Sequence, residues 1–203
     1  NRGLQRGPSL RADVDGDALA DEIYVALDPA SGPPCAAFVV VVTASGPISE
    51  PVWEMGSQAG LPEPRLHGTV DINGDGVPEI LVDEAVGAST QFVGALIATD
   101  GDLRRVEPGG NGDGATDGLF AYGGSVGHLE GVGCASEDRV VMSVATPGTS
   151  QQDVADGVYD VHRRFYELDG STLKLDTTEE KHLPADRLDT ELPEFATGPF
   201  GNC

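Results

Sequence analysis

The apolar positions of this chain fall into short runs that end in turns rich in glycine. The longest run, AAFVVVV at residues 36–42, is far too short to cross a bilayer and is typical of a buried β-strand. A turn and further strand-like sequence follow it, and the same succession occurs in GALIATDGDLRRV, residues 94–106. The pattern therefore predicts an all-β protein built from short antiparallel strands rather than long helices.

A second pattern repeats along the chain. DVDGDALADEIYVAL begins at Asp13, and DINGDGVPEILVDEA begins at Asp71, 58 residues later. In both stretches an acidic residue, Asp21 or Glu79, stands eight places after the first aspartate and opens an apolar strand. A period of this length predicts a fold made of repeated structural units.

A third copy is visible only in part. RRFYELDGSTLKL, residues 163–175, has the same succession of strand, turn and strand, and Asp138 stands where Asp21 and Glu79 stand. The earlier positions of this copy are Glu130, Val132 and Cys134, so the oxygen-bearing pattern is lost while the strands are expected to remain.

The polar residues of the first two copies have the spacing of a calcium loop. Oxygen donors occupy positions 1, 3, 5 and 9, and a backbone carbonyl at position 7 completes the first five ligand positions of such a loop. Without a cation these carboxylates repel one another, and a hard divalent ion reverses the sign of that energy. The sequence thus predicts two Ca²⁺ sites, one with ligands Asp13, Asp15, Asp17, Leu19 and Asp21, the other with Asp71, Asn73, Asp75, Val77 and Glu79.

The two loops differ at position 6. The second loop has Gly76 there, and the first has Ala18. If this position requires a left-handed backbone, alanine costs about 1 kcal/mol or more. We therefore expect the second site to be better formed, although the additional carboxylate of the first offsets part of the difference. An EF-hand is excluded because position 12 of the second loop, Val82, lies inside an apolar strand.

DINGDGVPEILVDEAVGAS, residues 71–89, resembles the FG-GAP repeat of integrin α-subunits and bacterial secreted proteins. Glu79 stands for the last ligand, and residues 87–89 stand for the Gly-Ala-Pro of that family. The stretch that begins at Asp13 is similar to the calcium half of the motif but lacks Gly-Ala, and the Phe-Gly element is absent before both loops. The resemblance implies β-propeller blades with a calcium ion bound in each intact loop.

The expected architecture is a repeat domain over residues 1–180, with repeats near 13–70, 71–129 and 130–180. Three units fall below the usual propeller number of ~4 to 8 blades. An incomplete propeller, closure by the termini or closure by a partner therefore remain open, and a compact β-sandwich is the alternative. Residues 181–203 are expected to form an irregular C-terminal strap with one helical turn around residues 185–192.

Three cysteines, Cys35, Cys134 and Cys203, match neither a zinc cluster nor a Cys-x-x-Cys redox motif. We expect an exported protein with a Cys134–Cys203 disulfide, because this bond would tie the C-terminal tail to the core. Three free thiols in a reducing compartment are the alternative. The chain begins with Asn1 rather than Met, which favours a mature or trimmed product, secreted or attached to the cell envelope, whose leader and anchor lie outside the sequence.

Charge narrows the range of partners. The chain has 12 Lys and Arg against 34 Asp and Glu, a formal net charge of −22. Such a surface repels nucleic acid and anionic membranes and favours cations and cationic partners. We therefore expect a calcium-stabilised, non-catalytic extracellular module for binding or adhesion, with a protein or carbohydrate partner; its oligomeric state is not predicted.

A secreted hydrolase with structural calcium is the alternative function. GGSVG, residues 123–127, spells the Gly-x-Ser-x-Gly motif around Ser125, but a nucleophile elbow requires a following helix and HLEGVGC is not expected to form one. NGDGATDG, residues 111–118, favours an exposed acidic loop over a third ion site because Gly109 would occupy position 1.

Overall fold

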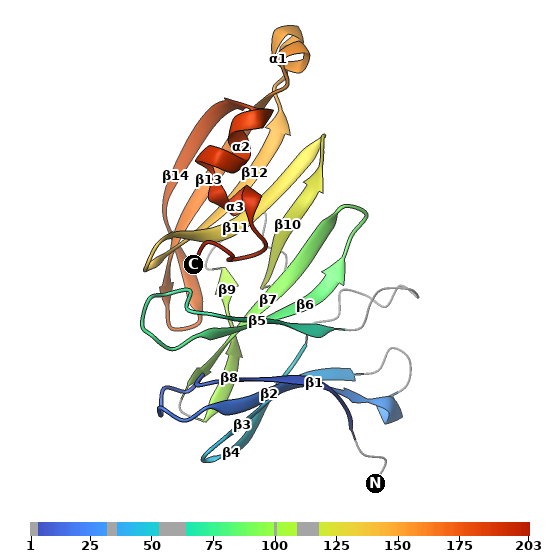
Figure 1. Cartoon of the computed structure of the whole chain (residues 1–203), viewed down its shortest axis with the longest axis vertical. Coiled ribbons are helices and arrows are strands. Elements are labelled where there is room, and N and C mark those ends of the chain that lie inside the picture. The colour runs from blue at the N-terminus through green and yellow to red at the C-terminus, as the bar shows by residue number, and fades with distance from the viewer. Residues whose placement is uncertain (1–3, 32–35, 53–63, 100, 109–117) are drawn as a thin grey trace. The chain divides into compact units, whose positions relative to one another are not determined.

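The computed structural model describes residues 4–31, 36–52, 64–99, 101–108 and 118–203 (Figure 1). The described part is all-β, as the apolar pattern predicts, with three short α-helices and one 3₁₀ turn. It divides into two compact units. The first contains residues Asn1–Asp71, Asp75–Val86 and Val93–Val106, and the second contains Ile72–Gly74, Gly87–Phe92 and Glu107–Cys203.

The first unit contains two sets of four antiparallel strands. In each set the strands follow one another in space in chain order, and a loop of eight residues separates the first strand from the second. The 3₁₀ turn η1 (Pro29–Ser31) lies between the second and third strands of the first set. The first set is β1 (Gln5–Ala12), β2 (Asp21–Asp28), β3 (Ala36–Thr43) and β4 (Gly46–Pro51), and the second is β5 (Arg65–Val70), β6 (Glu79–Val86), β7 (Thr90–Thr99) and β8 (Asp102–Arg105).

Both sets bury side chains in one hydrophobic core. The first set contributes Ile23 and Val25 of β2, which lie two and four residues after Asp21. The second set contributes Ile80 and Val82 of β6, which lie one and three residues after Glu79. Because successive side chains of a strand point to opposite faces, the two sets turn opposite faces to their shared core.

The third strand of each set agrees with this arrangement. β3 contributes Val39 and Val41 to the core, whereas β7 contributes Leu96 and Ala98. With the sequence offset of 58 residues, Val39 and Val41 correspond to Ile97 and Thr99, the opposite face of β7. The sets therefore pack front to back rather than with equivalent faces together.

The second unit is a sheet that carries two helices on one face (Figure 1). Its strand order is β7-β10-β11-β12-β13-β14-β9, because β7, whose residues 90–92 belong to this unit, is hydrogen-bonded to β10. β9 runs parallel to β14, whereas the other pairs from β10 to β14 are antiparallel. α2 packs on β14, and α3 packs on β11 and β12. The elements are β9 (Glu107–Pro108), β10 (Leu119–Ser125), β11 (His128–Ser136), β12 (Arg139–Pro147), α1 (Gln151–Asp156), β13 (Val158–Asp169), β14 (Thr172–Pro184), α2 (Ala185–Glu191) and α3 (Pro193–Ala196).

The strands expected in the third copy are present, and its loop is replaced by a tight turn. β13 and β14 form the hairpin expected from RRFYELDGSTLKL, with Gly170 in the left-handed region at φ 60°. The three positions that correspond to loop ligands in the other copies, Glu130, Val132 and Cys134, lie in β11 and pair with β12. Asp138 lies in the turn just before β12 and accepts a hydrogen bond from the Ser136 hydroxyl at 2.9 Å.

Most of the C-terminal strap is regular. Residues 181–184 belong to β14 and pair with β13, and α2 forms where one helical turn was predicted. A buried ion pair holds α3 against the sheet: Arg163 Nε donates to Glu194 Oε1 at 2.8 Å, and the Ser143 hydroxyl donates to the same oxygen at 2.7 Å. The Glu194 side chain is fully buried, and Arg163 Nη2 donates to its other oxygen at 3.3 Å. Arg163 and Ser143 together compensate the burial of this carboxylate.

The predicted Cys134–Cys203 disulfide is confirmed, with its Cα atoms 5.0 Å apart. Beside it the tail makes further contacts with β11: Phe200 N donates to Val132 O at 3.0 Å, and Asn202 Nδ2 donates to Cys134 O at 2.6 Å. Phe200 is buried and packs edge to face on Phe120. Cys35, the third cysteine, lies outside the described residues.

Replacing both bonded cysteines by serine should destabilise the second unit. The bond closes a sequence separation of 69 residues, for which the chain-entropy model gives about 4 kcal/mol. Urea unfolding without reductant should show this loss in Cys134→Ser/Cys203→Ser and an unchanged midpoint in Cys35→Ser, the matched thiol control. Equal midpoints for the double variant and the parent would contradict a stapled tail.

Candidate metal centre

The first loop, residues 13–20, wraps around the carboxylate of its first aspartate. Asp13 Oδ1 accepts from Gly16 N at 2.9 Å, and Asp13 Oδ2 accepts from Ala18 N at 2.8 Å. Two further turns follow, in which Asp15 Oδ1 accepts from Asp17 N at 3.2 Å and Asp17 Oδ1 accepts from Leu19 N at 2.7 Å. These bonds hold the loop in a curve with its carboxylates close together.

Asp21 lies beneath this loop as the first residue of β2. Its side chain is buried, and its Oδ2 accepts from Val14 N at 3.0 Å. One carboxylate oxygen from each of Asp13, Asp15 and Asp21 lies within 4.8 Å of the others, so these three predicted ligands form a group that can hold a metal ion. Asp17 is not part of this group.

The environment of Asp21 disfavours its charge in the absence of a cation. Burial raises the pKa of its carboxyl above the ordinary value, the Val14 N–H lowers it, and the neighbouring carboxylates of Asp15, Asp17 and Asp13 raise it. An ion bound among these carboxylates would reverse the effect of the neighbours. The arrangement is therefore suited to a cation with oxygen ligands.

The second loop has a similar wrap. Asp71 Oδ2 accepts from Gly76 N at 2.9 Å, which is the bond that Asp13 receives from Ala18, and Asp75 Oδ1 accepts from Val77 N at 2.8 Å. Glu79 is buried as the first residue of β6, as Asp21 is in β2. Asn73, the remaining side-chain ligand predicted here, lies in the segment Ile72–Gly74 of the second unit.

The two loops have left-handed residues at the same two positions. Position 4 has φ 76° at Gly16 and 73° at Gly74, and position 6 has φ 66° at Ala18 and 86° at Gly76. Position 6 is therefore left-handed in both loops, and Ala18 adopts this conformation despite its Cβ atom. Gly74 is also required by space, because a Cβ there would lie 2.3 Å from the Glu137 carbonyl oxygen.

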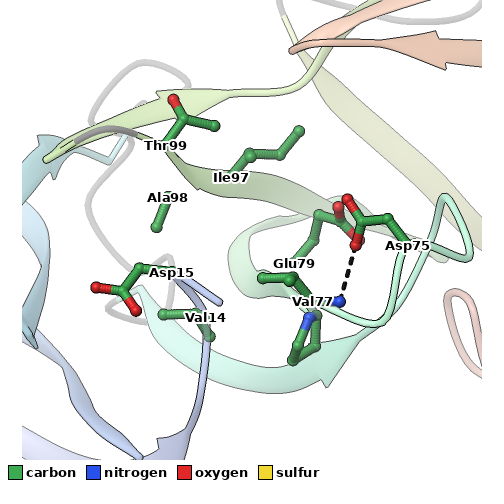
Figure 2. Close-up of a pocket in the computed structure, with 9 residues that line it drawn as sticks. Val14, Asp15, Asp75, Val77, Glu79, Ile97, Ala98 and Thr99 are labelled. Atoms are coloured by element: carbon green, nitrogen blue, oxygen red, sulfur yellow. Dashed lines mark hydrogen bonds between the residues drawn. The ribbon is translucent and has the colours of Figure 1, made fainter. Parts of the chain in front are cut away.

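The two loops meet beside a cavity of about 280 Å³ in the first unit (Figure 2). Asp15 of the first loop and Asp75 and Glu79 of the second line it, and Figure 2 shows Asp75 and Glu79 on the same side. A Cβ at Gly16 would lie 3.1 Å from Val77 Cγ2, so the loops are in close contact. The lining is otherwise mainly apolar, with Val14, Val77, Pro78, Ile97, Ala98 and Thr99.

Ser125 does not lie in a nucleophile elbow. It ends β10 and pairs with His128 across a two-residue turn, and a strand follows rather than a helix. The His128 ring is 2.5 Å from Glu130 Oε1, and Gly127 N donates to the Ser125 hydroxyl at 3.4 Å. The acidic stretch of residues 111–117 lies outside the described residues.

Sequence reasoning missed three groups of charged residues that only the fold brings together. Arg105 pairs with buried Glu84 through hydrogen bonds of 2.6 and 3.2 Å, and Arg163 holds Glu194. In the third group, His182 lies between two aspartates. The Arg104-Arg105 and Arg163-Arg164 pairs were a signal for the first two groups, because an acidic protein offers such residues carboxylate partners.

Comparisons with family models, with curated proteins and with solved structures give no match for this chain. Within the described ranges, no helix has the length and apolar character needed to cross a membrane. The loops and their strands are therefore the observations from which a function can be argued.

An exchange of the residues at position 6 tests the backbone match. Ala18→Gly should tighten ion binding at the first loop, since it removes the cost of about 1 kcal/mol of a left-handed backbone at alanine. Gly76→Ala introduces the same cost and should weaken ion binding at the second loop by a similar amount. Titration calorimetry with Ca²⁺ would show opposite changes of up to about fivefold in the two dissociation constants. A weaker first site in Ala18→Gly would contradict this account of the loop.

Proposed function

We propose that this chain is a calcium-stabilised, non-catalytic extracellular module that binds a protein or carbohydrate partner. One observation carries the proposal. Two loops far apart in sequence share left-handed angles at positions 4 and 6, a first aspartate bonded to the position 6 amide, and a buried acidic residue that opens the next strand. Acidic turns that bind no ion would not be expected to share all three features in two separate loops.

Calcium is the ion that suits these ligands best. The donors are carboxylates, one amide and backbone carbonyls, and Ca²⁺ prefers six to eight such oxygens at about 2.3–2.6 Å. The buried positions of Asp21 and Glu79 supply a charge beneath each loop that a divalent cation would neutralise. We expect two ions per chain, held by the ten residues predicted from the sequence.

The two strand sets of the first unit fit propeller blades better than a β-sandwich. Neighbouring blades of a propeller are copies related by rotation, so the front of one packs on the back of the next. Ile23 and Val25 share one core with Ile80 and Val82. The two strand sets therefore turn opposite faces to this core, as neighbouring blades do. In a two-sheet sandwich related by a twofold axis, equivalent faces would meet instead. We infer that the strand sets are repeats of one unit and that β11 to β14 form a third without an ion loop.

The disulfide and a weakly bound calcium ion are both typical of proteins outside cells. Disulfides persist in oxidising compartments, and calcium modules outside cells have dissociation constants of order 10⁻⁴ to 10⁻³ M. Such an affinity suits structural occupancy outside a cell rather than signalling. In this proposal calcium stiffens the loops, and the net charge of −22 favours a partner with a cationic surface.

Removal of calcium should lower the melting temperature. At a tenfold excess over the dissociation constant, each site adds about 1.4 kcal/mol, so two sites should raise the midpoint by about 5–10 °C for a chain of this length. Thermal unfolding in millimolar Ca²⁺ and in chelator would measure this. Asp21→Asn and Glu79→Gln should each lose about half of the shift, whereas Asp102→Asn, which removes an exposed carboxylate of the first unit, should keep it all. An unchanged midpoint in the parent chain would contradict the proposal.

The binding role requires a separate test. Retention of the chain on an immobilised cell-envelope fraction should depend on Ca²⁺, since the ordered loops hold the binding surface in shape. Retention should fall by about tenfold in chelator and partly in Asp21→Asn, and Asp102→Asn should behave as the parent does. Absence of any retention with calcium present would leave a structural role for the ion alone.

A further inference from the structure

Helix α1 is a short arm in the connection between β12 and β13, and Figure 1 shows it beyond the ends of these strands. None of its six side chains is buried, and Val154 is 65% exposed. The helix begins with a capping box, in which Ser150 and Asp153 bond to each other, and it ends at Gly157 in the left-handed region. Hydrophobic burial therefore contributes little to its position.

Asp153 connects this arm to the sheet. Its Oδ2 accepts from the Ser150 backbone N–H at 3.3 Å, which completes the cap, and from the Ser150 hydroxyl at 2.5 Å. Its Oδ1 lies 3.3 Å from His182 Nε2 on β14. Gly148 lets the aspartate approach closely, because a Cβ there would lie 2.6 Å from Asp153 Cβ. One side chain thus takes part both in the cap of the helix and in its attachment to the sheet.

His182 faces a carboxylate at each ring nitrogen. Nδ1 lies 2.7 Å from Asp160 Oδ1 on the neighbouring strand β13, and Nε2 faces Asp153. A neutral imidazole donates from one nitrogen only, whereas the imidazolium ion donates from both. Both contacts are therefore attractive only when His182 is protonated.

We propose that His182 is a pH-sensitive latch that holds α1 on the β13–β14 hairpin in its protonated form and releases it on deprotonation. The bond to Asp160 is the shorter one, so the neutral ring keeps its proton on Nδ1. The Nε2 lone pair then faces the Asp153 carboxylate, and this contact becomes repulsive. The contact of Asp153 with the sheet is lost, while the backbone bonds at the base of the arm, from Gly148 N to Val158 O and from Ala185 N to Gly157 O, and the β13–β14 pairing remain.

The surrounding charges raise the pKa of His182 above the ordinary value for histidine. The hydrogen bond with Asp160 raises the pKa of His182, as do the charges of Asp153 and Asp160, while desolvation opposes them. The Ser150 hydrogen bond lowers the pKa of Asp153, so that this carboxyl stays ionised throughout. On the same face, two cross-strand pairs along, His162 Nδ1 lies 3.4 Å from Glu180 Oε1.

The raised pKa of His182 decides in which pH range the latch contributes to stability. A histidine whose folded-state pKa lies above its unfolded value stabilises the fold below the unfolded pKa. That contribution is lost as the pH rises through the folded value. His182 should therefore hold α1 on β14 below the ordinary histidine pKa of about 6.5. The helix should be released as the pH rises from there through the higher folded-state pKa.

NMR on the whole chain at constant Ca²⁺ tests the latch between pH 5.5 and 9. We expect the amides of Asp153 and Val154 to titrate with the His182 ring, and their exchange protection factors to fall by about two- to fivefold, the range of an exposed ion pair. His182→Gln should abolish the transition. His162→Gln, the matched change in the neighbouring pair, should leave it intact.

Three results would overturn the proposal. Two of them concern the parent chain: the NMR signals of the α1 amides do not change over this pH range, or they change with a midpoint different from that of the His182 ring. The third is loss of the transition in His162→Gln to the same extent as in His182→Gln. The first two come from the parent chain alone, so they remain decisive if a variant fails to fold.

Discussion

The first unit depends on how its loops accommodate like charges at the start of buried strands. Asp21 and Glu79 are each the first residue of a strand that enters the shared core, and each is almost fully buried. Burial of a carboxylate is costly unless donors or a cation compensate it. Backbone N–H groups compensate part of the charge, for example Val14 N at Asp21. In our account calcium supplies the rest and so connects each loop to the strand that follows it.

This requirement also accounts for the contrast between the units. The second unit has no eight-residue loop between β11 and β12, and its strands turn at Glu137 and Asp138. It is instead stabilised by devices that need no ion: the Cys134–Cys203 bond, the Arg163–Glu194 pair and the packing of Phe200 on Phe120. The first unit also has a buried ion pair, Arg105–Glu84, but no disulfide within its described residues.

Much of the strand layout could be predicted from sequence because local patterns control it. Apolar runs mark β3 and β7, the loop spacing marks the starts of β2 and β6, and a terminal cysteine limits the possible disulfides. The left-handed backbone at Ala18 was also predictable, from its alignment with Gly76. The front-to-back packing was not, because strand alternation alone does not show which face meets which partner.

Pairs between distant segments escaped prediction for a similar reason. His182 meets Asp153 and Asp160 only because β14 pairs with β13 in one register and α1 folds back at Gly148. A shift of one residue would turn His182 to the other face. Glu194 likewise finds Arg163 through the path of the C-terminal helices, for which the local sequence has no signal.

The number of calcium ions bound per chain tests the central claim most directly. Equilibrium dialysis of metal-free protein against ⁴⁵Ca²⁺, from micromolar to about 10 mM, should saturate at two ions per chain, at one in Asp21→Asn and at one in Glu79→Gln. No saturable binding over this range, or binding that both substitutions leave at two, would contradict the account.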